Sequence, residues 1–504
     1  MSSIFNIELY GTVEKVANFF DIKGSALSIL NPIADTNIVS IQIDTNKLDI
    51  NKKLTREDAK WINIKVLVEG ILQDAKLKLH GSASTQYDNN KYSYRIKMAE
   101  GSESINGMKY FVLIKGEEAD PTVCAANKLA KELGLIAAFG KMVNLKINGK
   151  DRGYYYLVER VSSKEYLKRE FSISKFVKLS NVADWSRKEK VFGSVHGSDF
   201  DLYPGHLEKD KNPLHPYAVG VYKEMSHIVL GDDPKKMTNF FDADYMGKYL
   251  AILSLFNEKH HITGDNLKFL YDFNTSKLYP IYRQEYGSRT LVNCIMTQED
   301  IFFNNFVNYN KLIFEKSAPI YSRSTTSKIF QSLLSNNEVR NRRDYHLNTI
   351  ITKRQYFLDL ITETYEKNLP VMLGSGRSRR SQYFLEKQQL SVFNQMCDLA
   401  EKYLNYCHIY GSYNSENHIL NITVDAFSQI KISSKNGLFE DYFINGIEFN
   451  KKLDLVYHTI DIDINGGTTE DLIFVNNITK DTISSSHIYI NEIKELDKTE
   501  QNVL

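Results

Sequence analysis

The sequence predicts an α+β fold with a β-rich N-terminal segment, a mixed central part and a C-terminal β-sandwich. Apolar and polar residues alternate in short stretches before residue 99, and helix-spaced apolar residues dominate from 296 to 408. From about residue 409 the alternation returns, interrupted by Gly and Asn turns. Period-two alternation is typical of half-buried strands, and a period near 3.6 is typical of amphipathic helices.

Composition narrows the class of protein. A chain of 504 residues with 42% apolar and 25% charged residues suits a globular protein of several domains. The formal net charge of +1 gives no global attraction to nucleic acid, which is therefore an unlikely partner. The four cysteines form no CxxC pair, which disfavours a zinc site. We expect no signal peptide and no membrane association, and a location in the cytoplasm or within an assembled particle such as a spore coat or virion.

The N-terminal elements are predicted to be strands. The stretches "SIFNIELYG", "NIVSIQIDT" and "INIKVLVEG" alternate within residues 1–74. Strands over 75–81 and 92–98 then form a predicted hairpin, which presents Lys91, Arg95 and Lys97 near one end. These cations either contact an anionic ligand or form the solvated face of an edge strand, where lysines discourage aggregation.

A helix over 120–134 is predicted next, because Asp120 can cap its start and Gly134 can end it. A hairpin across Asn148-Gly149 and a helix over 242–260 follow. This helix runs into the polar loop "HHITGDN" (260–266), which precedes two strands over 267–273 and 277–283. Further helices are predicted before the C-terminal strands.

The polar loop has the spacing of a phosphoryl-transfer site. Kinases place a catalytic base and a metal ligand in an Asp-x-x-x-x-Asn loop, with a second metal-binding acid on a later strand. Here Asn266 stands five residues after His261, so a histidine replaces the aspartate. The later segment "YPIYRQEYG" offers Glu285, or Gln284 as a neutral substitute.

Several blocks in order resemble the CotH-like (spore coat protein H) atypical kinase family. They include "AKLKLHGSAS", "NKYSYRIKM", "FVLIKGEEADPTVCAANKLAKELG", "YYYLVERV" and "GDNLKFLYDF". The resemblance implies an atypical protein-kinase-like two-lobed domain over 75–385, with its N-lobe ending at about 180. Around it we expect an N-terminal β-rich segment (1–74), a helical connector (386–408) and a C-terminal β-sandwich (409–504).

The resemblance also implies roles for particular residues, with ATP and Mg²⁺ or Mn²⁺ as cofactors. One of Lys91, Arg95 and Lys97 would hold the nucleotide phosphates, and Glu159 would pair with that cation. Asn266 and Glu285 would bind the metal through oxygen, which Mg²⁺ prefers. His261, or His260 with a one-residue shift, would act as the base, since the ordinary pKa of histidine is about 6.5.

Three departures from the family pattern bear on activity. The family's Arg-Asn pair in the first helix reads Ala126-Asn127, the catalytic Asp reads His261, and the metal-acid element reads "PIYRQE". Two functions therefore remain open. One is a kinase that phosphorylates protein hydroxyls. The other is a degenerate pseudokinase that serves in assembly, with coat or capsid proteins as partners.

Simpler interpretations also remain open for the site residues. His260 and His261 suit a helix C-terminus, where imidazolium complements the helix dipole. Asp265 and Asn266 suit a turn that enters a strand. Glu285 could form a surface salt bridge with a neighbouring arginine, Arg283 or Arg289.

Overall fold

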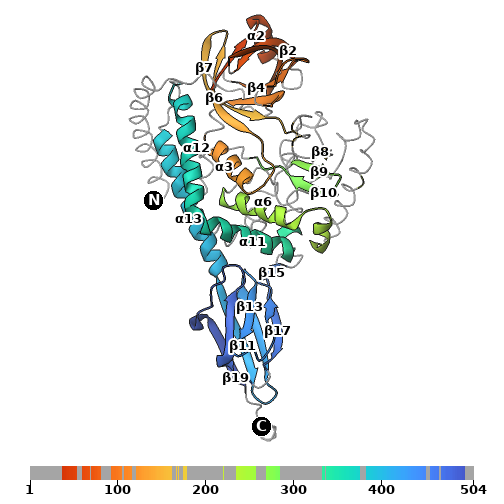
Figure 1. Ribbon diagram of the computed structural model, residues 1–504, viewed down its shortest axis with the longest axis vertical. Coiled ribbons are helices and arrows are strands. Elements are labelled where there is room, and N and C mark those ends of the chain that lie inside the picture. The colour runs from red at the N-terminus through yellow and green to blue at the C-terminus, as the bar shows by residue number, and fades with distance from the viewer. Residues whose placement is uncertain are drawn as a thin grey trace.

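The computed structural model shows strands and helices around several cores (Figure 1). The described residues are 37–53, 60–68, 70–80, 92–104, 107–115, 121–161, 166, 169, 174–178, 220, 234–256, 268–283, 332–334, 336–374, 382–449, 455–464 and 467–493. Sheets and helices alternate along the chain and are mixed in space, which agrees with the predicted α+β class.

A closed barrel forms the top of the molecule in Figure 1. Its strands run in the order β1-β2-β3-β4-β5-β7-β6, and the parallel pair β1 and β6 closes it. Their bounds are Ile38–Gln42 (β1), Ile62–Val68 (β2), Ile71–His80 (β3), Ser93–Met98 (β4), Tyr110–Lys115 (β5), Gly140–Ile147 (β6) and Lys150–Glu159 (β7). The predicted boundary between residues 74 and 75 falls inside β3, because β1 and β2 complete the same barrel.

The two faces of the barrel wall have different neighbours. Side chains such as Ile96, Phe111 and Leu157 fill the interior. Helix α3 (Pro121–Glu132) lies against the outer face, where Val123 packs with Tyr156. Gly134 adopts φ 79° just after α3, as predicted from its position at the helix end. A shorter helix, α2 (Thr45–Lys53), follows β1.

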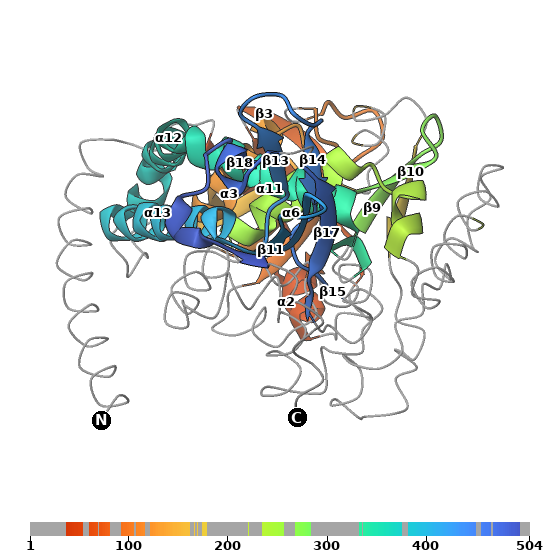
Figure 2. The same cartoon turned by 90° about the horizontal axis from the view of Figure 1, so that it is seen from below.

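A helical body lies beneath the barrel. Its helices are α6 (Ala243–Leu255), α11 (Asn337–Thr352), α12 (Arg354–Gly374) and α13 (Gln382–Asn405). A small sheet of β8 (Ser174–Lys178), β9 (Lys268–Asp272) and β10 (Lys277–Pro280) lies on the side opposite α12 and α13 (Figures 1 and 2). Asp242 begins α6 by accepting a hydrogen bond from the Tyr245 amide at 2.7 Å, which satisfies one of the free donors of the first turn. None of the helices in the described ranges is long and apolar enough to span a membrane.

Two further sheets share one hydrophobic core at the C-terminal end. One has the order β17-β12-β11-β19 and the other β14-β13-β18. Ile409 and Ile422 from the first sheet meet Ile432 and Phe474 from the second. The bounds are Cys407–Asn414 (β11), Ile419–Ala426 (β12), Ile430–Ser434 (β13), Tyr442–Ile444 (β14), His458–Asp463 (β17), Leu472–Asn476 (β18) and Ile488–Ile493 (β19), with β15 (Glu448–Phe449) and β16 (Leu455–Val456) forming a separate pair.

The C-terminal sheets are fixed to the helical body by polar and aromatic contacts. The Asn476 side-chain amide donates to the Leu404 carbonyl at 2.6 Å, and the Asn348 amide donates to the Ile478 carbonyl at 3.1 Å. Tyr403 stacks on Phe427 with ring centroids 4.8 Å apart. Seen from below, the C-terminal strands lie nearest the viewer, with α6 and α11 behind them (Figure 2).

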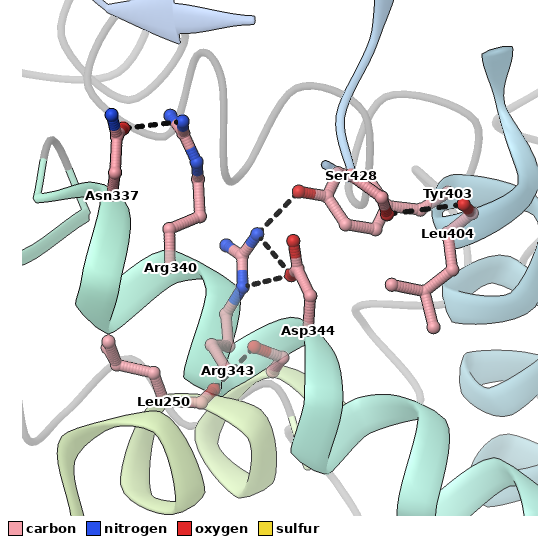
Figure 3. A network of polar contacts seen from close by, with 9 residues as sticks. Leu250, Asn337, Arg340, Arg343, Asp344, Tyr403, Leu404 and Ser428 are labelled. Atoms are coloured by element: carbon pink, nitrogen blue, oxygen red, sulfur yellow. Dashed lines mark hydrogen bonds and ion pairs between the residues drawn. The ribbon is translucent and has the colours of Figure 1, made fainter. Parts of the chain in front are cut away.

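A buried charge network joins α11 to α13 (Figure 3). Arg343 and Asp344 are 1% and 0% exposed, and the Arg343 Nε donates to an Asp344 carboxylate oxygen at 2.8 Å. The same guanidinium donates to the Tyr403 hydroxyl and lies 5.2 Å from the ring centroid. Burial lowers the pKa of Arg343, but Asp344 and Tyr403 together outweigh it, so the pKa lies above its ordinary value.

Candidate functional site

The β3–β4 hairpin carries four cations on the outer face of the barrel. Lys76 lies directly opposite Lys97, and Lys78 lies directly opposite Arg95. The Arg95 Nε donates a hydrogen bond to the His80 Nδ1 at 2.8 Å, so this imidazole nitrogen is unprotonated. Like charges directly opposite one another destabilise a strand pair. An anion on this surface would relieve that repulsion.

Arg95 lies on the same barrel face as helix α3. The register pairs Arg95 with Val112 on β5, and Val112 with Val158 on β7. Directly paired residues point to the same side of a sheet, and Val158 packs against the cluster that contains α3. Arg95 is therefore two strands away from Val158, which packs in the part of the barrel that α3 covers.

Glu159 points to the other side of the barrel wall. It pairs with Phe111, which belongs to the barrel interior, and it is only 3% exposed. Its carboxylate accepts a hydrogen bond from Arg169 at 2.5 Å. Within the described residues Glu159 is thus paired with Arg169, and the register sets Glu159 and Arg95 on opposite faces. The expected pairing with one of Lys91, Arg95 and Lys97 stays a prediction, since Lys91 lies outside the described residues.

A buried polar contact connects α3 to the outer face. The Asn127 side-chain amide donates to the Tyr156 hydroxyl at 3.0 Å. Burial raises the pKa of Tyr156, and the charge of Arg283 is among the influences that lower it. A Cβ at Gly140 would lie 2.2 Å from the Tyr156 hydroxyl, so only glycine leaves room for this ring.

The β9–β10 hairpin opens toward the same region. The Ile281 amide donates to the Lys268 carbonyl at 2.9 Å, so the start of β9 and the end of β10 lie side by side. The Tyr282 amide then donates to the Ile136 carbonyl at 2.8 Å, just after α3. The segments that contain Asn266 and Glu285 therefore connect to one end of this hairpin, next to the barrel.

Comparison with known proteins gives the family. The model of the family described as CotH kinase protein matches residues 77–357, which is more than half of the 504-residue chain. The chain belongs to the CotH kinase family. The resemblance read from the sequence is confirmed by this match. No curated protein matches the chain significantly.

Several predicted site residues of this CotH-family chain lie outside the described residues. They are Lys91, His261, Asn266 and Glu285, together with the alternative Gln284. Their neighbours agree with the predicted order, since α6 ends at Leu255 and β9 begins at Lys268. Within the described part, no group of three or more His, Cys, Asp or Glu side chains could hold a metal. The roles of these four residues remain predictions.

Sequence reasoning missed three residues of the outer face. Lys78 and His80 flank Arg95, and Tyr156 receives Asn127. The alternation of "AKLKLH" could have identified Lys78 and His80, since both share a phase opposite to the apolar Leu77 and Leu79. Nothing local marks Tyr156 among the three consecutive tyrosines of "GYYYLVE".

Proposed function

We propose that this CotH-family chain is an atypical ATP-dependent protein kinase. In this proposal the barrel is the nucleotide-binding lobe and the helical body is the second lobe of a kinase-like domain. The C-terminal sheets form an appended β-sandwich. One observation carries the proposal: Arg95 lies on the barrel face that packs against α3, and the open end of the β9–β10 hairpin bonds to Ile136 just after α3.

The phosphates are assigned to the cationic outer face. Arg95 and Tyr156 lie on the same face, two strands and two residues apart, which corresponds to about 12 Å between Cα atoms. The guanidinium of Arg95 can form two parallel hydrogen bonds to phosphate oxygens. His80, which accepts from the Arg95 Nε, holds the guanidinium in place. Lys97 is exposed beside it and adds positive charge.

The metal is assigned to Asn266 and Glu285. Amide and carboxylate oxygens suit Mg²⁺. Asn266 comes just before β9 and Glu285 comes soon after β10, and these two ends of the hairpin lie side by side. When bound, Mg²⁺ or Mn²⁺ would neutralise charge that develops on the transferring phosphoryl group. His261 would accept the proton of the substrate hydroxyl, and Asn266 would stand five residues beyond it.

The test combines nucleotide binding with phosphate transfer. We expect ATP with Mg²⁺ to raise the melting temperature, and labelled phosphate from ATP to enter a protein substrate or the chain itself. Arg95→Ala should weaken ATP binding at least tenfold, because hydrogen bonds to charged groups contribute about 1.5–3 kcal/mol. Lys150→Ala removes an exposed cation at the β6–β7 turn and should leave binding unchanged. Glu285→Ala should abolish transfer while the fold is retained.

A degenerate pseudokinase with an assembly role is the second candidate. It is favoured by Ala126, which is fully buried in the hydrophobic core at the position where the family carries a long polar side chain. Absence of any ATP–Mg²⁺ effect on melting, together with tight binding to coat or capsid proteins, would support this function and exclude the kinase.

A further inference from the structure

The outer face of the sheet β17-β12-β11-β19 carries exposed aromatic rings. Tyr410 and Tyr489 are 46% and 49% exposed, although tyrosine rings are largely apolar. They lie directly opposite one another on the neighbouring strands β11 and β19. Their ring centroids are 5.4 Å apart and their planes differ by only 16°. Two parallel rings thus face solvent side by side.

The two rings leave part of their faces uncovered. Stacked carbon atoms touch at about 3.5–4.0 Å, so nearly parallel rings with centroids 5.4 Å apart are displaced sideways. In addition, β19 is the last strand of its sheet among the described residues, so no further described strand of that sheet flanks Tyr489. His408 extends the row, with its ring centroid 6.3 Å from that of Tyr489 and 5.1 Å from that of His487.

Polar side chains lie beside this aromatic row. The register places Thr423 next to Tyr410, and Thr459 next to Thr423, and the two hydroxyls are 2.9 Å apart. In the adjacent row the Asn421 amide donates to the Asp461 carboxylate at 2.7 Å; Asp461 is exposed and Asn421 is half-buried. The face therefore combines ring surfaces with oriented hydroxyl, amide and carboxylate groups.

The strands of this sheet carry acidic residues and no Lys or Arg, which disfavours anionic partners. β11, β12, β17 and β19 contain no lysine or arginine, and the residues in register with this face include Asp425, Asp461 and Asp463. Nucleic acid and anionic lipid are bound mainly by basic side chains. A partner for this face must be uncharged or cationic, must offer flat apolar patches and must carry many hydroxyl groups.

We propose that this face binds a neutral polysaccharide, with pyranose rings lying along the Tyr410–Tyr489 row. The C–H face of a pyranose is weakly positive and matches the negative face of an aromatic ring. The sugar hydroxyls would bond to Asn421, Asp461 and Thr423, which are rigidly held by the sheet. The site is distinct from the proposed nucleotide site and does not depend on kinase activity.

The full-length chain tests this by affinity electrophoresis in native gels that contain xylan, mixed-linkage β-glucan, hydroxyethyl cellulose or α-glucan. We expect retardation in at least one of these gels. Tyr410→Ala/Tyr489→Ala should lower the association constant at least tenfold. Phe443→Ala is the matched control, because Phe443 is 52% exposed on the other sheet of the same C-terminal part.

Other outcomes would overturn the proposal. These are migration unaffected by every polysaccharide, equal retardation of the wild type and the double variant, or retardation only by heparin or DNA. A self-association that the double variant abolishes, without polysaccharide binding, would assign the face to a second copy of the chain instead. Asn421→Ala keeps both rings, and its partial loss of binding would show that hydroxyl recognition contributes.

Discussion

The buried pair of Arg343 and Asp344 gives a quantitative prediction. Both side chains are at most 1% exposed, and the Arg343 guanidinium also donates to Tyr403 on α13. Removing one partner of a buried ion pair costs about 3–5 kcal/mol, because the remaining charge stays buried without its counter-charge. We therefore expect Arg343→Met and Asp344→Leu each to lower the free energy of unfolding by that amount.

The double variant Arg343→Met/Asp344→Leu should behave differently. With both charges gone, the site holds apolar side chains of similar volume, and such exchanges are often close to neutral. The remaining penalty should be about 1–3 kcal/mol, for the Tyr403 hydroxyl that loses its donor. The double variant should thus be more stable than either single variant.

The assay is denaturant unfolding followed by far- and near-ultraviolet circular dichroism, with the midpoints compared across the four proteins. Far-ultraviolet spectra before unfolding check that each variant is folded. If the double variant loses as much stability as the two single variants added together, the attraction between the two charges does not stabilise this fold. The assigned pairing in Figure 3 would then be refuted.

Three further predictions follow from close contacts. Gly247→Ala should lower the free energy of unfolding by about 1–3 kcal/mol, because the new Cβ would lie 2.6 Å from the Arg342 carbonyl carbon. This loss should exceed the gain from the better helix propensity of alanine. An unchanged denaturation midpoint would contradict the close crossing of α6 and α11. Burial lowers the pKa of His346 below its ordinary 6.5, although the bond to Asp244 opposes this. As the pH falls, the histidine of the unfolded chain takes up a proton before that of the folded chain, so the folded state loses stability below about pH 6.5. Between about pH 7.5 and about pH 5.5, the melting temperature of His346→Gln should therefore fall less than that of the wild type. Tyr156→Phe should lower the free energy of unfolding by about 1–3 kcal/mol, because the buried side-chain amide of Asn127 loses its acceptor. In a double-mutant cycle, adding Asn127→Ala to this variant should lower the free energy of unfolding little further.

Much of the secondary structure could be predicted from local patterns. The helix at 120–134 is observed as α3 (Pro121–Glu132), and the hairpin across Asn148-Gly149 is observed as β6–β7. The strands over 267–273 and 277–283 are observed as β9 and β10. These elements succeed because capping residues, turn glycines and apolar periodicity all act within a few residues of chain.

The site was only partly predictable. Arg95 was identified as a cation of the hairpin strand, but its neighbours Lys78 and His80 were not. Glu159 was expected to pair with one of Lys91, Arg95 and Lys97; among the described residues it pairs with Arg169, on the face opposite to Arg95. Spacing along the sequence does not show whether residues on two distant strands lie on the same face of the sheet, since a shift of one residue in register moves a side chain to the other face.

The sequence by itself determined the family, the α+β class and the positions of α3, the β6–β7 hairpin and the β9–β10 hairpin. Tertiary structure decided the rest. The barrel closes only because β1 pairs with β6, which joins Ile38 to Asn144, and because the Asn148 side chain bonds to Ile43 across 105 residues. Such pairings depend on which apolar faces can be buried together, and that is a property of the whole folded chain rather than of any local stretch.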